Sequence, residues 1–204
     1  MAADRKLQIP RKCTMTALSA RPWSALATYF LNMVSGKIRL HDPVHRLLAS
    51  SFIRLTDHAA VAYEGARKQL LEITRRKAGQ RLALVLSAVS HFEDCVSTLS
   101  RANNFASALN GATDHAYRQF VIPPEDADQL RLFRNRIQHS DEDIIKGRSD
   151  SAIIWVRDDS IALAGYVLTF SGLAACIEGL NEMAHEIASN GVSFDAQADN
   201  GDKG

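Results

Sequence analysis

Residues 42–79 read DPVHRLLASSFIRLTDHAAVAYEGARKQLLEITRRKAG, and this stretch decides the fold. Apolar residues recur in it every three or four positions, which is the spacing of one face of an α-helix. Asp42 is a typical N-cap, and Pro43 suits the first helical position because its missing N–H has no partner to lose there. The pattern predicts a long amphipathic helix that runs to about Arg76 and is broken at Gly79.

The same periodicity continues on both sides of this stretch. It predicts helices over residues 16–34, 81–109 and 171–188, and a further helix that starts after Pro123-Pro124. Residues 151–168 differ, because two runs of β-branched residues flank an Asp-rich turn there, as in a β-hairpin. The sequence therefore predicts an all-α fold with a small β-hairpin inserted before the last helix.

Length and composition favour a single globular domain. The chain has 204 residues, of which 46% are hydrophobic and 23% are charged. We expect a flexible N-terminus over residues 1–15, one helical domain over 16–190 and a disordered, Asp- and Gly-rich tail over 191–204. The longest apolar stretch, residues 82–89, is too short to span a bilayer, so no membrane association is expected.

The cysteines and histidines show no metal-binding pattern. Cys13, Cys95 and Cys176 are far apart and form neither a zinc motif nor a disulfide framework, and the histidines form no H-E-x-x-H pair. No phosphate-binding or dinucleotide-binding glycine loop is present either. We therefore expect no metal and no cofactor, and a reducing cytoplasmic location.

Net charge gives no general sign of nucleic-acid binding, since the chain carries a net charge of +1. Two local basic clusters remain, one between Arg67 and Arg81 and one at Arg131, Arg134 and Arg136. The first is also explained as a solvated helix end, because Lys and Arg favour the last turn of a helix.

The second cluster lies in residues 130–142, LRLFRNRIQHSDE, which contain the motif Arg134-Asn135-x3-His139. RNA carries its own nucleophile in the 2′-hydroxyl, so its cleavage needs a proton acceptor, positive charge on the phosphate and a proton donor. Arginine binds phosphate oxygens through its fork of N–H groups, and histidine transfers protons near neutral pH. The motif therefore supplies the groups for RNA cleavage without a metal.

Helix geometry separates the two catalytic candidates. Asn135 and His139 share a face at i, i+4, but Arg134 lies about 140° around the helix from His139. A symmetric dimer that packs this face against itself would bring two such sets together. Alternatively, Arg134 pairs with a nearby acidic residue and Asn135 is a helix-end hydrogen-bonding group.

A second polar cluster, His91, Glu93 and Asp94, lies in the apolar helix over residues 81–109. Glu93 or Asp94 supplies a supporting carboxylate to the site, or the cluster is a solvent-facing stripe.

Residues 133–142, FRNRIQHSDE, resemble the signature of HEPN domains, R-[polar]-x3-H. The resemblance implies an up-and-down helical bundle, a homodimer and a composite active site at the dimer interface. It also implies a metal-independent endoribonuclease with Arg134 and His139 as catalytic pair and Asn135 as their polar partner, while Arg131 and Arg136 are expected to bind substrate. Many such proteins act in toxin–antitoxin or phage-defence systems, some with an antitoxin or regulatory partner.

One position departs from the resemblance. Toxins of this kind that are silenced by nucleotide transfer carry a tyrosine two residues after the histidine, whereas this chain has Asp141, a possible supporting residue. Two other hypotheses stay open: a non-catalytic HEPN module that binds RNA, nucleotide or a protein, and an unrelated helical regulator.

Overall fold

The computed structural model describes residues 9–19, 23–38, 43–73, 75–76, 78–113, 116–147 and 153–190, without the side chains of residues 78, 79 and 141. The expected N-cap Asp42 and the expected disordered tail, residues 191–204, lie outside this part of the chain.

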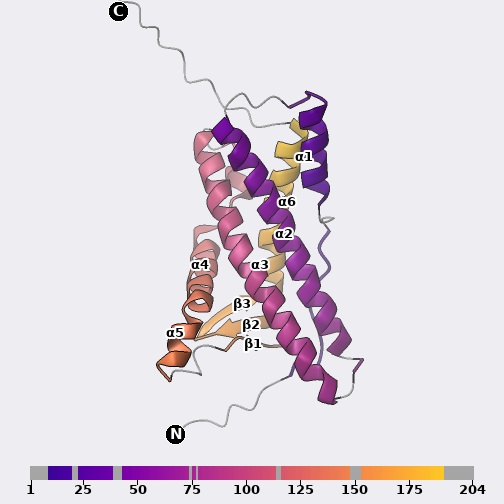
Figure 1. The fold of residues 1–204 in the computed structure, drawn as a ribbon, viewed down its shortest axis with the longest axis vertical. Helices are drawn as coiled ribbons and strands as arrows, with labels where there is room; N and C mark the ends of the chain where they lie inside the picture. The colour runs from indigo at the N-terminus through magenta and orange to yellow at the C-terminus, as the bar shows by residue number, and fades with distance from the viewer. Residues whose placement is uncertain are drawn as a thin grey trace, which may run out of the picture.

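Two long helices form the axis of an elongated molecule, and the other elements pack along them (Figure 1). The described elements are, in order, α1 (Ser24–Val34), α2 (Pro43–Ile73), α3 (Ala78–Ala112), the 3₁₀ helix η1 (Arg118–Phe120), α4 (Pro124–Gln138), α5 (Ser140–Ile145), β1 (Trp155–Val156), β2 (Ser160–Leu163), β3 (Tyr166–Thr169) and α6 (Phe170–Asn190). The expected mostly helical fold with a small β element before the last helix is confirmed.

The antiparallel pair α2 and α3 approaches closely at Gly65. A Cβ atom at this position would lie 2.8 Å from Nδ1 and Cε1 of His91, so a larger residue would force the imidazole ring to move. Further along the core, Phe92 of α3 stacks on Phe170 at the start of α6, with ring centroids 5.4 Å apart. The largest fully buried side chains come from five different helices and one strand: Tyr29, Phe52, Ile53, Tyr63, Leu70, Ile73, Phe92, Leu99, Leu109, Phe133, Ile161 and Phe170.

The first helix is shorter than the sequence pattern predicts. It begins at Ser24, whereas the apolar spacing predicted a helix from Thr16. Residues 16–19 are irregular, and the backbone N–H of Leu18 donates to Oε1 of Glu64 at 2.8 Å. Pro22 in the sequence accounts for the difference, because a proline disfavours helical backbone in the residue before it.

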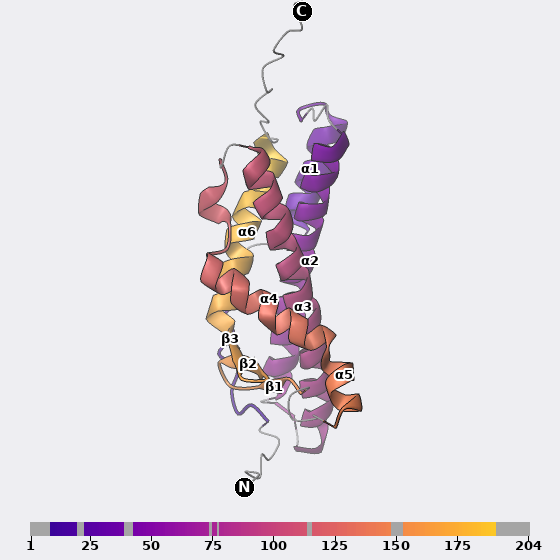
Figure 2. The same ribbon diagram turned by 90° about the vertical axis from the view of Figure 1, so that its left-hand side faces the viewer.

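The predicted hairpin is part of a three-stranded antiparallel sheet with the order β1-β2-β3. The extra turn is Ala164-Gly165, where both residues have positive φ (51° and 91°), as a two-residue type I′ turn requires. Leu163 and Tyr166 pair on either side of it. The sheet lies at the lower end of the molecule, between α4 and α6 (Figures 1 and 2).

The expectation of a flexible N-terminus over residues 1–15 is wrong for residues 9–15. The backbone N–H of Arg11 donates to Oδ1 of Asp158 at 2.8 Å, and the Thr14 hydroxyl donates to the Asp158 carbonyl at 2.8 Å. Met15 is buried in the core. The turn between β1 and β2 thus supplies the hydrogen-bond partners that hold this segment; residues 1–8 are outside the described part.

Residues 80–112 of α3 are long and apolar enough to cross a membrane by length and composition alone. The helix carries Glu93 and Asp94 midway, and its buried residues, among them Phe92, Val96 and Leu99, belong to the core shared with α2 and α6. The helix is thus part of the core of the bundle.

Asp57 joins α2 to the beginning of α1 inside the core. It is fully buried, and its Oδ2 accepts the backbone N–H of Leu26 at 3.2 Å, while Oδ1 has no partner among the described residues. Burial raises the pKa of Asp57, and the backbone N–H groups of Leu26 and Trp23 and the nearby His185 offset part of that rise.

The raised pKa of Asp57 predicts a pH dependence of stability. The folded state holds this proton more tightly than the unfolded state, so the contribution of Asp57 to stability is greatest below its unfolded pKa of about 4 and falls as the pH rises through the folded pKa. Asn at this position still accepts the Leu26 N–H but does not titrate. We expect the free energy of urea unfolding of wild type to decline relative to that of Asp57→Asn between pH 3.5 and 7; a difference that is constant with pH would contradict this.

Candidate functional site

The motif lies on α4, which crosses one side of α3 (Figure 2). Pro124 occupies the first turn together with Glu125 and Asp126, whose charges suit a helix N-terminus. Leu130 and Phe133 are buried against the core, and Ile137 is partly buried, as their spacing predicts. Phe133 therefore fixes the rotation of α4, and with it the directions of the residues on either side.

Arg134 lies on the side of α4 that faces α3. On a helix it is about 40° around from Leu130 and about 60° from Ile137. Its Nε is buried and has no hydrogen-bond partner, and no ion pair of its guanidinium occurs among the described residues. Arg134 forms no ion pair with Glu142 or Asp143 in the described part, where those carboxylates bind other residues, and the side chain of Asp141, the third expected partner, lies outside that part. Arg134 thus presents a positive charge with its stem held in protein.

His139 stands at the junction between α4 and α5. Its backbone N–H donates to the carbonyl of Asn135 at 3.1 Å, closing α4, and its own carbonyl accepts the N–H of Asp143, opening α5. The side chain is 63% exposed, and its Nδ1 lies 3.5 Å from Oε1 of Glu142. Hydrogen bonds from Lys146 and His139 lower the pKa of Glu142, so this carboxylate is ionised beside the imidazole.

A single chain does not join the two catalytic candidates. No hydrogen bond links Arg134 to His139 among the described residues, and on an α-helix the two positions lie about 140° apart. Asn135, which lies between these two residues in the sequence, is half-buried. Its backbone carbonyl accepts the N–H of His139, and this is the hydrogen bond that connects the two residues in the described part.

The two expected substrate-binding arginines are both engaged in ion pairs. Arg131 donates from Nε and Nη2 to Oδ1 of Asp128 at 3.3 and 3.1 Å. Arg136 donates from Nη1 to Oδ2 of Asp143 at 3.1 Å, and that carboxylate is nearly buried. Neither arginine is a free cation, and each must exchange its partner if it is to bind a phosphate.

The first basic cluster is compensated in the same way. Arg67 bonds to Glu64, and Arg75 and Arg76 both lie within 4 Å of Glu72. These pairs favour the reading of this cluster as a solvated helix end.

The polar cluster on α3 divides between its faces. His91 packs against α2 at Gly65, and Asp94 is exposed. Glu93 is half-buried and lies two turns before Ser100, on the side of α3 that α4 covers. Glu93 is therefore the better placed of the two expected supporting carboxylates. The side chain of Asp141 is outside the described part.

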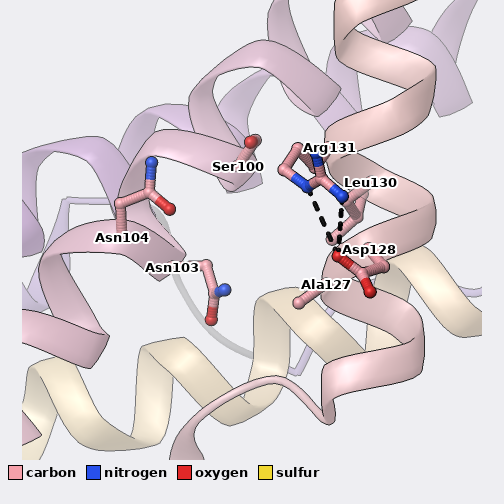
Figure 3. Close-up of a pocket in the computed structure, with 7 residues that line it drawn as sticks. All are labelled: Ser100, Asn103, Asn104, Ala127, Asp128, Leu130 and Arg131. Carbon is pink, nitrogen blue, oxygen red and sulfur yellow. Dashed lines mark hydrogen bonds and ion pairs between the residues drawn. The ribbon is translucent and has the colours of Figure 1, made fainter.

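A polar cleft between α3 and α4 was not anticipated from the sequence. It has a volume of about 200 Å³ and lies one helical turn before Arg134 on α4 (Figure 3). Its lining residues come from both helices: Ser100, Asn103, Asn104, Ala127, Asp128, Leu130 and Arg131. Two adjacent asparagines inside an otherwise apolar helix are poor helix formers, and that was the available signal.

The three cysteines are free. Burial raises the pKa of Cys95 to about 12 and that of Cys176 to about 11, so both stay protonated and unreactive at neutral pH. This agrees with their expected role as small, at least partly buried apolar residues.

The bond between Arg136 and Asp143 is expected to hold α5 against α4. We predict that Asp143→Asn lowers the free energy of unfolding by about 1 kcal/mol, because it removes a charged hydrogen bond that is partly shielded from water. Hydrogen exchange in residues 140–145 should become faster. Glu142→Gln is the matched control, since Glu142 and its partners are exposed and its loss should leave the exchange unchanged; equal effects of the two substitutions would contradict the assignment.

Comparisons of the chain with family models, with curated proteins and with solved structures found no significant match. The chemistry that Arg134 and His139 can perform is therefore inferred from their own positions in the fold.

Proposed function

We propose that this chain is a metal-independent endoribonuclease of the HEPN type, in which Arg134 binds the scissile phosphate and His139 transfers protons. The observation that carries the proposal is the guanidinium of Arg134, which has no partner among the described residues and whose Nε is buried, while other arginines nearby are paired with carboxylates. An arginine held in this state lacks a counter-charge, and a phosphodiester would supply one.

The reaction uses the arginine of the motif and two imidazoles. A neutral imidazole removes the proton of the 2′-hydroxyl, the 2′-oxygen attacks phosphorus, and the bond to the 5′-oxygen breaks. A protonated imidazole gives its proton to that leaving oxygen. The products are a 2′,3′-cyclic phosphate and a free 5′-hydroxyl, and Arg134 stabilises the charge that develops on the phosphate oxygens.

We infer that the active form is a homodimer. The mechanism uses one imidazole as base and another as acid, whereas the motif supplies one histidine per chain. Next to His139, the side chains of Ile144 and Ile145 on α5 are exposed, the second by 84%. Exposed aliphatic side chains are stabilised when a second protein surface covers them, so such residues often mark a contact between proteins. A two-fold contact through α5 would bring the two His139 residues of the dimer close to one cleft.

The biological role that fits such an enzyme is that of an RNA-cutting effector, as a toxin or in phage defence, in a reducing cytoplasm. Its free cysteines fit that compartment. Control would then come from an antitoxin or another regulatory protein.

The direct test is RNA cleavage in EDTA with analysis of the new ends. We predict that His139→Ala and Arg134→Gln each lower the cleavage rate by at least about a hundredfold, because each removes a group that acts on the transition state. Cleavage by wild type should leave 2′,3′-cyclic phosphate ends.

Two exposed residues on α2 give matched controls. His58→Ala and Arg54→Ala remove the same residue types far from the motif and should keep full activity. All four variants should melt cooperatively near the wild-type temperature. Unchanged cleavage in both motif variants would overturn the proposal.

A non-catalytic RNA-binding module is the second candidate, and the ion pairs of Arg131 and Arg136 favour it. If these arginines stay bound to their carboxylates, the protein neutralises few RNA phosphates, so few counterions are released when RNA binds.

This candidate predicts binding without turnover and with a weak salt dependence. A plot of log K against log salt should have a slope no steeper than about −2 for single-stranded RNA, which corresponds to two or three phosphates. Fluorescence anisotropy with a labelled oligonucleotide in EDTA gives the slope, and gel analysis of the same samples shows whether RNA is cut. A slope steeper than about −4 would exclude this form of binding.

A further inference from the structure

The cleft between α3 and α4 contains a polar group that the fold leaves unsatisfied. Asn103 is only 9% exposed, and its Oδ1 is buried with no hydrogen-bond donor in the part of the chain that the structure describes. A buried acceptor without a partner destabilises a protein, by roughly 1–3 kcal/mol, so folded chains usually satisfy it. Figure 3 shows the amide of Asn103 projecting from α3 into the gap in front of Ala127.

The remaining lining residues give the cleft a definite character. Ser100 and Asn104 add a hydroxyl and a second amide from α3, and Leu130 adds an apolar surface from α4. At the rim, the exposed guanidinium of Arg131 donates two hydrogen bonds to one oxygen of Asp128 (Figure 3). The cleft is smaller than a typical drug-sized site, so it fits one flat group of a larger ligand.

We propose that this cleft is a nucleobase subsite, which holds the amino edge of an adenine or a cytosine of the bound RNA. A side-chain amide offers one acceptor beside one donor, and the amino edges of these bases offer a donor beside an acceptor. The exocyclic amino group donates to Oδ1 of Asn103, and the ring nitrogen next to it accepts from Nδ2. The planar guanidinium of Arg131 provides a face on which the base stacks.

The position of the cleft ties it to the catalytic candidates. Arg131 precedes Arg134 by three residues on α4, roughly 5 Å along the helix axis. A base in the cleft therefore belongs to a nucleotide close to the phosphate that Arg134 binds. The inference rests on the proposed function. It assigns to Arg131 a stacking role, and Arg131 can stack on a base while it remains paired with Asp128.

The test uses RNA binding in EDTA with His139→Ala protein, so that no probe is cut. The probes are labelled ten-nucleotide homopolymers of adenosine and of cytidine, each beside its analogue that lacks the exocyclic amino group. We expect at least one amino-bearing homopolymer to bind about tenfold more tightly than its analogue, the factor expected for satisfying one buried acceptor. Adding Asn103→Leu should abolish this preference.

Asn181→Leu is the matched control, because Asn181 is also buried with unpartnered amide atoms but does not line this cleft. It should keep the preference for the amino group. Asn103→Leu should also melt at or above the wild-type temperature, since it removes an unsatisfied acceptor, whereas a residue needed for folding would lower the melting temperature.

The outcomes separate the subsite from the nuclease. Cleavage by wild type together with a preference that survives Asn103→Leu, or no preference in any protein, overturns the subsite and leaves the nuclease standing. An Asn103-dependent preference in a protein that cuts no RNA supports the subsite and overturns the nuclease. Absence of both RNA cleavage and RNA binding overturns both.

Discussion

The close contact between α2 and α3 at Gly65 is the constraint on which the rest of the fold depends. The imidazole of His91 lies 2.8 Å from the place that a Cβ of residue 65 would take, so glycine lets this side chain of α3 pack directly on the backbone of α2. That contact sets the rotation of α3 and so decides which of its faces remains for other helices. The face with Ser100 and Asn103 is the one left for α4.

The packing of α4 in turn separates the charges of the motif. Phe133 is fully buried, so its neighbour Arg134 lies partly buried at the interface with α3, where its Nε is shielded from water. A cation in such surroundings interacts strongly with an anion because the local dielectric constant is low. His139, five residues later, lies where the helix ends and its side chain reaches solvent. The same helix thus places a fixed charge in the protein and a titratable group at the surface.

Helix starts and the core face of α4 could be predicted from the sequence because they depend on local patterns. Apolar spacing located α2, α3, α4 and α6, and Leu130 and Phe133 are buried as that spacing implied. The predicted start of α1 at Thr16 was wrong. Apolar spacing continues across residues 16–23 of the sequence, although Pro22 disfavours a helix there. The third strand was missed because its turn depends on a positive φ at Ala164, which is unusual for alanine.

For the candidate site, the sequence predicted which residue types take part, but it did not predict their contacts. The motif named Arg134 and His139, but the pairing of Arg136 with Asp143 needs α5, a helix that the sequence pattern did not indicate. Asn103 could not be distinguished from a solvent-facing asparagine, because its burial depends on α4, whose buried residues lie more than twenty positions later. Long-range packing, which no local pattern encodes, therefore assembles the cleft.

The bonds from Arg11 and Thr14 to Asp158 have a consequence for the order in which the protein forms during synthesis. Arg11 and Asp158 are 147 positions apart, so the N-terminal segment leaves the ribosome long before its partner exists. At a translation rate of roughly 5–20 residues per second, that interval is on the order of ten seconds. The hairpin of α2 and α3 closes through a short connection and can form within it. Docking of the N-terminal segment is thus a late event, which waits for the sheet to be translated.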